Sequence, residues 1–113
     1  MTTEGLHLET QAGGDAGDGV QTQRLVATGD LDLATAPILG ERVDALISSG
    51  ATVIILDAAG IEFLDSSGVR VLVQASNALE PLGGRLSIEN MSAPVERVLE
   101  ITGLLERYRS PAG

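Results

Sequence analysis

The sequence contains no cysteine and no lysine, and its single histidine is His7. Without cysteine, the chain cannot form a disulfide bond, a thiolate metal site or a thiol redox switch. Without lysine, it cannot form a phosphate-binding loop of the Walker type. A transition-metal site and a serine hydrolase are also disfavoured, because one histidine in the first expected strand supplies neither a ligand set nor a base for a serine. We therefore expect a protein that is not an enzyme and that needs no cofactor or metal.

Long apolar runs are also missing. The longest purely aliphatic run is "VIIL" at 53–56, and the N-terminal "MTTEGLHLET" lacks the apolar region of a secretory signal. A cytoplasmic domain without membrane insertion is therefore expected. The net charge is −9, from sixteen acidic residues and seven arginines. Such a surface repels nucleic acids and anionic lipids but is compatible with a basic protein partner.

What the sequence does contain is a regular order of predicted strands and helices. Its 113 residues fit one domain, 1–113, with a flexible Gly/Asp-rich hairpin loop at 11–19 and a frayed tail at 110–113. Apolar alternation indicates strands, whereas apolar residues three or four positions apart indicate helices. Strands are predicted at 5–9, 20–29, 52–57 and 85–89, with a possible last one at 105–108, and helices between Thr35 and Gly50, from the 61–73 segment to the break at 79–84, and between Ser92 and Gly103.

This order predicts an α/β fold with a mostly parallel, mixed sheet of four to five strands and three or more helices. The first strand is expected to be antiparallel, as part of a hairpin. The run "TVIILD", 52–57, is apolar at successive positions, which predicts a central strand covered on both faces. The predicted core combines large aliphatic side chains with strand or helix periodicity: Val53, Ile55, Leu72, Val73, Ile88, Val98 and Leu99.

The segment "IEFLDSSGVRVLV", 61–73, is the most informative part of the chain. It places Asp65, Ser66 and Ser67 where a strand ends and a helix begins, which is where sites gather in parallel sheets. Asp65 or Ser66 can cap the helix, which is worth about 1 kcal/mol. A cap leaves the second serine and Gly68 unexplained. Glycine in a first helical turn lets another backbone or a phosphate approach closely.

Two other motifs are weaker. "DLDLATAPILGE", 30–41, has acids at three positions of a calcium loop, but it lacks the required glycine and contains Pro37. A solvated strand–helix connection is the better interpretation. "GGDAGDG", 13–19, opens no helix and so does not fit a dinucleotide-binding loop.

Three stretches of the sequence resemble the STAS domain: "GDLDLATAP" at 29–37, "LDAAGIEFLDSSGVRVL" at 56–72 and "RLSIENMSAPVERVLEITGL" at 85–104. The similarity covers about 25–108 and is strongest to bacterial anti-sigma factor antagonists. The loop at 11–19 is longer than is typical for the family, and the sequence stops soon after "LERYR", where many relatives add a terminal helix.

The resemblance implies a partner-switching function. In the family, the serine after the aspartate is phosphorylated by a protein that is both anti-sigma factor and kinase, and that serine is Ser66 here. Unphosphorylated protein would bind this partner and release the sigma factor, and a PP2C-type phosphatase would reverse the modification. Ser67 falls at the variable Ser/Thr position. The partner-binding residues expected on this basis are Asp30, Asp32, Leu64, Asp65, Ser66, Ser67, Gly68 and Val69.

Two alternatives stay open. The first is a non-enzymatic STAS subunit of a lipid-transport ABC complex, in which a similar D-S-[ST]-G block contacts an ATPase. The second is a nucleotide-binding STAS module, which the lack of a phosphate loop disfavours.

Overall fold

A four-stranded mixed sheet forms the centre of the computed structural model, which describes residues 5–15 and 21–109. The strand order is β1-β2-β3-β4. β1 is antiparallel to β2, whereas β2, β3 and β4 are mutually parallel, as predicted. The strands are β1 (Leu6–Asp15), β2 (Gln21–Leu31), β3 (Val53–Leu64) and β4 (Arg85–Glu89). The helices are α1 (Ala36–Ser48), α2 (Ser66–Leu79), the 3-10 helix η1 (Glu80–Leu82), α3 (Ala93–Ile101) and α4 (Leu105–Tyr108).

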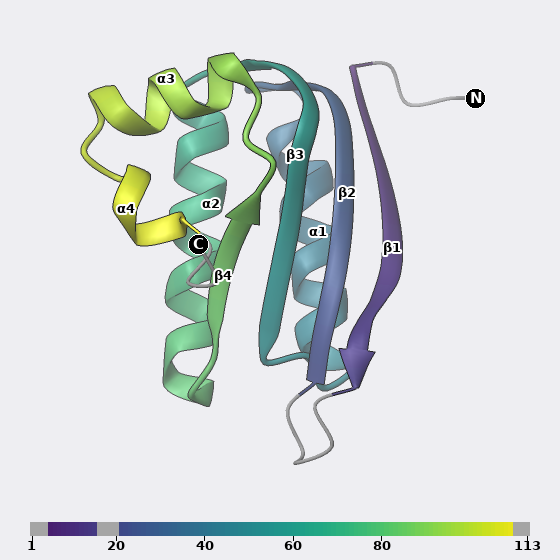
Figure 1. Ribbon diagram of the computed structural model, residues 1–113. Coiled ribbons are helices and arrows are strands. Elements are labelled where there is room, and N and C mark those ends of the chain that lie inside the picture. Colours follow the sequence, from purple (N-terminus) through teal and green to yellow (C-terminus); the bar gives the residue numbers. More distant parts are fainter. Residues whose placement is uncertain (1–4, 16–20, 110–113) are drawn as a thin grey trace.

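Helices α1 and α2 cover one face of the sheet (Figure 1). The apolar side chains between them and the strands include Leu39, Leu56 and Leu72, all 2% exposed. Of the predicted core, four residues are buried and three are half-buried. The buried ones are Val53, Leu72, Ile88 and Leu99, and the half-buried ones are Ile55, Val73 and Val98.

Ile55 is half-buried because β3 is not covered equally on its two faces. Side chains alternate along a strand, so Ile54 and Leu56 point toward α1 and α2 while Ile55 points to the opposite face. On that face Ile55 is aligned with Arg24 of β2 and with Ser87 of β4. The prediction that β3 is covered on both faces was therefore wrong at this position.

Charged residues from three strands meet on this opposite face. Arg24 donates to Asp57 at 2.8 Å and to Glu89 at 2.7 Å. These two hydrogen bonds raise the pKa of the Arg24 guanidinium. Burial opposes ionisation of Asp57, but hydrogen bonds from the Ala59 N–H, Arg24 and Asn90 outweigh it and lower the pKa of this carboxyl. The network joins β2, β3 and β4 on the face of the sheet opposite α1 and α2.

The C-terminal segment corrects another prediction. Residues 105–108 form the one-turn helix α4 and not a strand, and only Arg109 pairs with Ile88 of β4, in a single parallel bridge. Tyr108 is fully buried, and this burial raises its pKa. Arg107 holds α4 against α2 by donating to Asn77 and to Glu80, both at 3.0 Å. Packing against other elements therefore determines the conformation of residues 105–108.

β4 has the predicted bounds, whereas β1, β2 and β3 each end later than predicted. β1 reaches Asp15, with a register shift after Ala12, so residues 11–15 of the expected loop belong to a strand. The rest of that loop, and the predicted tail at 110–113, lie outside the described residues. β2 and β3 continue past two register shifts until Leu31 pairs with Leu64. Their carboxyl ends therefore lie side by side, which places the two following strand–helix connections next to each other.

In the described ranges, no helix is both long and apolar enough to cross a bilayer. His7 lies in the first strand, as predicted, and is exposed on β1 at the edge of the sheet.

Candidate functional site

The connection from β3 to α2 is built around the Asp65 side chain. Asp65 has extended backbone angles and occupies the N-cap position of α2. Its Oδ1 accepts hydrogen bonds from the N–H groups of Ser67 at 2.8 Å and Gly68 at 3.1 Å. The predicted cap is therefore confirmed, with Asp65 as the capping residue. Ser66 is left as the first residue of the helix, with no capping role.

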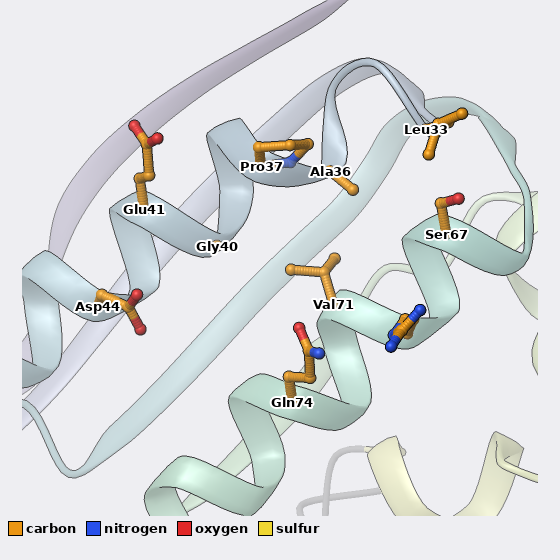
Figure 2. Close-up of a pocket in the computed structure, with 10 residues that line it drawn as sticks. Leu33, Ala36, Pro37, Gly40, Glu41, Asp44, Ser67, Val71 and Gln74 are labelled. Carbon is orange, nitrogen blue, oxygen red and sulfur yellow. The ribbon is translucent and has the colours of Figure 1, made fainter.

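The two serines have different surroundings. Ser66 is exposed, and among the described hydrogen bonds none involves its hydroxyl group. Ser67 is half-buried and lines a groove between α1 and α2. Figure 2 shows Ser67 at the start of α2, below Leu33 of the connection between β2 and α1. A free, solvent-accessible hydroxyl at a rigid helix start is available for modification, and Ser66 has these properties.

Gly68 is required by packing. A Cβ at this position would lie 2.7 Å from the Leu31 carbonyl oxygen and 2.5 Å from Cδ1 of Leu64. The sequence suggested that this glycine allows either another backbone segment or a phosphate to come close. In the structure, the backbone of β2 is the group that comes close. The same Leu31 carbonyl accepts a hydrogen bond from the Asp65 N–H at 3.3 Å. The start of α2 is thus fixed to the end of β2.

The connection from β2 to α1 has its own aspartate. Asp32 Oδ1 accepts from the N–H groups of Ala34 and Thr35, both at 3.0 Å. The Thr35 hydroxyl accepts from the Asp32 N–H at 2.9 Å and donates to the Asp30 carbonyl at 2.8 Å. Thr35 occupies the N-cap position of α1, as predicted, but its side chain bonds backward into the connection and not to the helix. Asp32 is therefore a structural residue of this loop.

An open groove of about 380 Å³ lies between α1 and α2. Figure 2 shows Ala36, Pro37 and Gly40 of α1 on one side and Ser67, Val71 and Gln74 of α2 on the other. Leu33 stands at one end of the groove and is 77% exposed. The charged residues of the groove are Glu41, Asp44 and Arg70. An apolar floor with a few charges suits a protein segment better than a small polar ligand.

The structure separates the eight predicted partner-binding residues into groups. Ser66 and Ser67 reach the surface or the groove, whereas Leu64 and Gly68 are buried. Val69 is half-buried and packs against the core. Asp30 borders a shallow depression with His7 and Glu62, on the β1 side of the site.

Leu33 and Phe63 were not predicted, although 77% and 48% of their respective surfaces are exposed beside this corner. Leu33 lies between a strand and a helix, so neither periodicity shows which way it points. The alternation in "IEFL", 61–64, would suggest that Phe63 and Ile61 share a face, but Ile61 is buried. The register shifts between β2 and β3 change the alternation there.

Within the two described ranges, no three His, Cys, Asp or Glu side chains gather as metal ligands. The acidic residues of 30–41 form no such group. The Asp32 carboxylate instead accepts hydrogen bonds from two backbone N–H groups.

Known proteins are similar to this chain in sequence and in fold. A family model described as "Mlab, STAS domain" matches residues 17–106. The anti-sigma-B factor antagonist of Bacillus subtilis is 34% identical over 76 residues, which are 67% of this chain and 69% of that protein. The anti-sigma F factor antagonist of Paenibacillus polymyxa is 29% identical over 80 residues, covering 70% and 68%. The structure of the antagonist SpoIIAA in its unphosphorylated form superimposes with a TM-score of 0.77 at 23% identity, over 92% of this chain and 86% of that one.

Proposed function

This chain belongs to the STAS domain family and, within it, to the anti-sigma factor antagonists, and we propose that it acts by partner switching controlled at Ser66. In the unphosphorylated state it binds a cognate anti-sigma factor that is also a serine kinase, and the sigma factor is released. Phosphorylation of Ser66 ends the binding, and a PP2C-type phosphatase restores it. The protein itself carries out no catalysis and acts in the cytoplasm.

The observation that carries this proposal is the exposed Ser66, whose neighbour in the chain, Ser67, lines a partly apolar groove. Asp65 fixes the helix start, and Gly68 packs it onto β2, so the hydroxyl is presented from a rigid corner. The groove and the exposed Leu33 provide apolar area for a partner next to the modified atom. A phosphate at Ser66 therefore falls at the edge of the proposed interface.

The electrostatic effect of phosphorylation is large enough to switch binding. A phosphoserine adds about −1.5 to −2 charges at neutral pH. Against one partner carboxylate about 6 Å away, repulsion is about 1 kcal/mol in a water-like dielectric and about 5 kcal/mol at an effective value near 20. Binding should weaken between about tenfold and several thousandfold, at ~1.4 kcal/mol per decade.

The proposal is tested with serine variants and the purified kinase. Ser66→Ala should accept no phosphate and bind the partner constitutively, whereas Ser67→Ala should still be labelled. Ser66→Asp should bind weakly by calorimetry. Ser48→Asp is the matched control, because it adds the same charge at the last residue of α1, at the opposite end from the connection that precedes this helix. Labelling that survives in Ser66→Ala and disappears in Ser67→Ala would reassign the acceptor, and wild-type affinity of Ser66→Asp would refute the electrostatic switch.

A second candidate function is a STAS subunit of a lipid-transport ABC complex. The description of the matching family model, "Mlab, STAS domain", does not name an anti-sigma function and keeps this candidate open. The same groove would then contact an ATPase. Co-purification from native cytoplasm distinguishes the two, since a transporter ATPase recovered in place of a kinase would favour the second.

A further inference from the structure

Arg70 lies one helical turn after Ser66 on α2. Residues four apart on a helix are neighbours on its surface, and helical side chains lean toward the N-terminus. Arg70 is therefore directed toward the turn that contains Ser66. It is exposed, and it makes no ion pair or side-chain hydrogen bond with any other described residue. By contrast, Arg24, Arg107 and Arg109 each form ion pairs.

A phosphate at Ser66 has few other local partners. Helix N-termini commonly bind phosphate through their free N–H groups. Here the Asp65 carboxylate already accepts the N–H groups of Ser67 and Gly68, and the Asp65 carbonyl accepts that of Val69 at 3.0 Å. These three donors are not available without breaking the cap, and among the described hydrogen bonds the Ser66 N–H is the one donor of this turn left without an acceptor. Arg70, four residues after Ser66, is the one cationic residue of α2.

We propose that Arg70 is the intramolecular ligand of phosphorylated Ser66 and that phosphorylation thereby withdraws a positive charge from the groove. This inference rests on the proposed modification of Ser66. Arg70 lines the groove together with Leu33 and Ser67. In the unphosphorylated protein its guanidinium faces solvent there and is available to an acidic group of the partner. Once the guanidinium is paired with the phosphate, it is no longer available to the partner.

The switch consequently has two parts. The phosphate adds negative charge at the edge of the groove, and it also occupies Arg70. Glu41 and Asp44 are then the groove's remaining charged residues, and both are acidic. A partner segment whose acidic group pairs with Arg70 loses that contact and meets a more negative surface. The two parts act in the same direction.

The test uses the full chain with phosphoserine introduced at position 66 during translation, so that neither kinase nor partner is needed. The second ionisation of the phosphate is followed by ³¹P NMR. Arg70 should favour the dianionic form of the phosphate. The second pKa of the phosphate should therefore be about 0.2–0.4 unit lower in the protein that keeps Arg70 than in Arg70→Gln. Arg70→Lys should keep part of the shift. Arg85→Gln is the matched control, since Arg85 is exposed at the amino end of β4, away from the site.

A phosphate that titrates identically in the Arg70 and Arg70→Gln proteins would overturn the inference, as would an equal change in Arg85→Gln. The Arg70 Nε–H signal provides an independent measurement, and it should move on phosphorylation and return when the phosphate is removed. Both results are separate from the proposed function. A cognate kinase that modifies another residue would refute the Ser66 switch but leave the measured Ser66–Arg70 pairing unchanged.

Discussion

The connections that follow β2 and β3 have the same carboxylate chemistry but use their hydroxyl groups differently. After β2, Asp32 accepts two backbone N–H groups, and after β3, Asp65 does the same. The nearby hydroxyl of Thr35 is 3% exposed and bonded to the backbone on both sides. The hydroxyl of Ser66 is exposed, and none of the described hydrogen bonds includes it.

The difference shows how a structural corner becomes a modifiable one. Where the aspartate alone satisfies the free N–H groups, a neighbouring hydroxyl is released from any structural role. At Thr35 the hydroxyl is part of the loop and is inaccessible. At Ser66 it can be altered without removing a bond that holds the helix start in place.

The largest expected effect comes from tightening the second corner. Gly68→Ala places a methyl group 2.7 Å from the Leu31 carbonyl oxygen and 2.5 Å from Leu64 Cδ1. Overpacking at this contact should destabilise the protein by about 2–3 kcal/mol, measured by urea unfolding. Ser67→Ala in the same turn should change stability by less than about 0.5 kcal/mol. Near-equal stabilities of the two variants would show that α2 can shift away from β2.

The comparison of hydroxyls is tested directly by removing each one. Thr35→Val keeps the shape of the side chain but leaves the Asp32 N–H and the Asp30 carbonyl without their partner. It should cost about 1–2 kcal/mol in the same unfolding assay. Ser66→Ala should cost less than about 0.5 kcal/mol, since an exposed hydroxyl is lost. If Ser66→Ala destabilised the protein as much as Thr35→Val, Ser66 would have a structural bond and the contrast between the corners would fail.

The smallest effect concerns a third aspartate. Asp57 also accepts a backbone N–H two residues on, from Ala59, but it is bound to Arg24 as well. Because its pKa is lowered in the folded state, it stabilises the protein above the unfolded value near 3.9, and this is lost as pH falls through the lower folded pKa. Arg24→Gln should therefore reduce stability by less than about 1 kcal/mol at pH 7.

The stability difference between wild type and Arg24→Gln should shrink as the pH falls below the unfolded value near 3.9 and through the lowered pKa of Asp57, where this carboxyl becomes protonated. Chemical unfolding at several pH values measures it. A difference that did not depend on pH would assign the Arg24 effect to packing of its aliphatic stem.

The sequence allowed prediction of features that depend on local pattern. The element order, the antiparallel first strand and the Asp65 cap follow from periodicity and from capping preferences. Features that depend on contacts between distant segments were not predictable in the same way. A glycine is required at position 68 because a carbonyl oxygen of β2 lies too close for a side chain. The helix α4 forms where Tyr108 is buried beneath other elements. Leu33 and the groove depend on how α1 and α2 pack together.

The Leu31 carbonyl belongs to one strand and receives the N–H of Asp65 from another, far along the chain. Such a contact has high sequence separation, and it forms only after β2 and β3 have paired. A nascent chain, or a short peptide carrying "DSSG", does not contain this corner. A kinase that recognises Ser66 in its folded geometry therefore acts on completed molecules and passes over unfolded ones. Phosphate at this residue would then report how much correctly folded antagonist is present, and not merely how much has been synthesised.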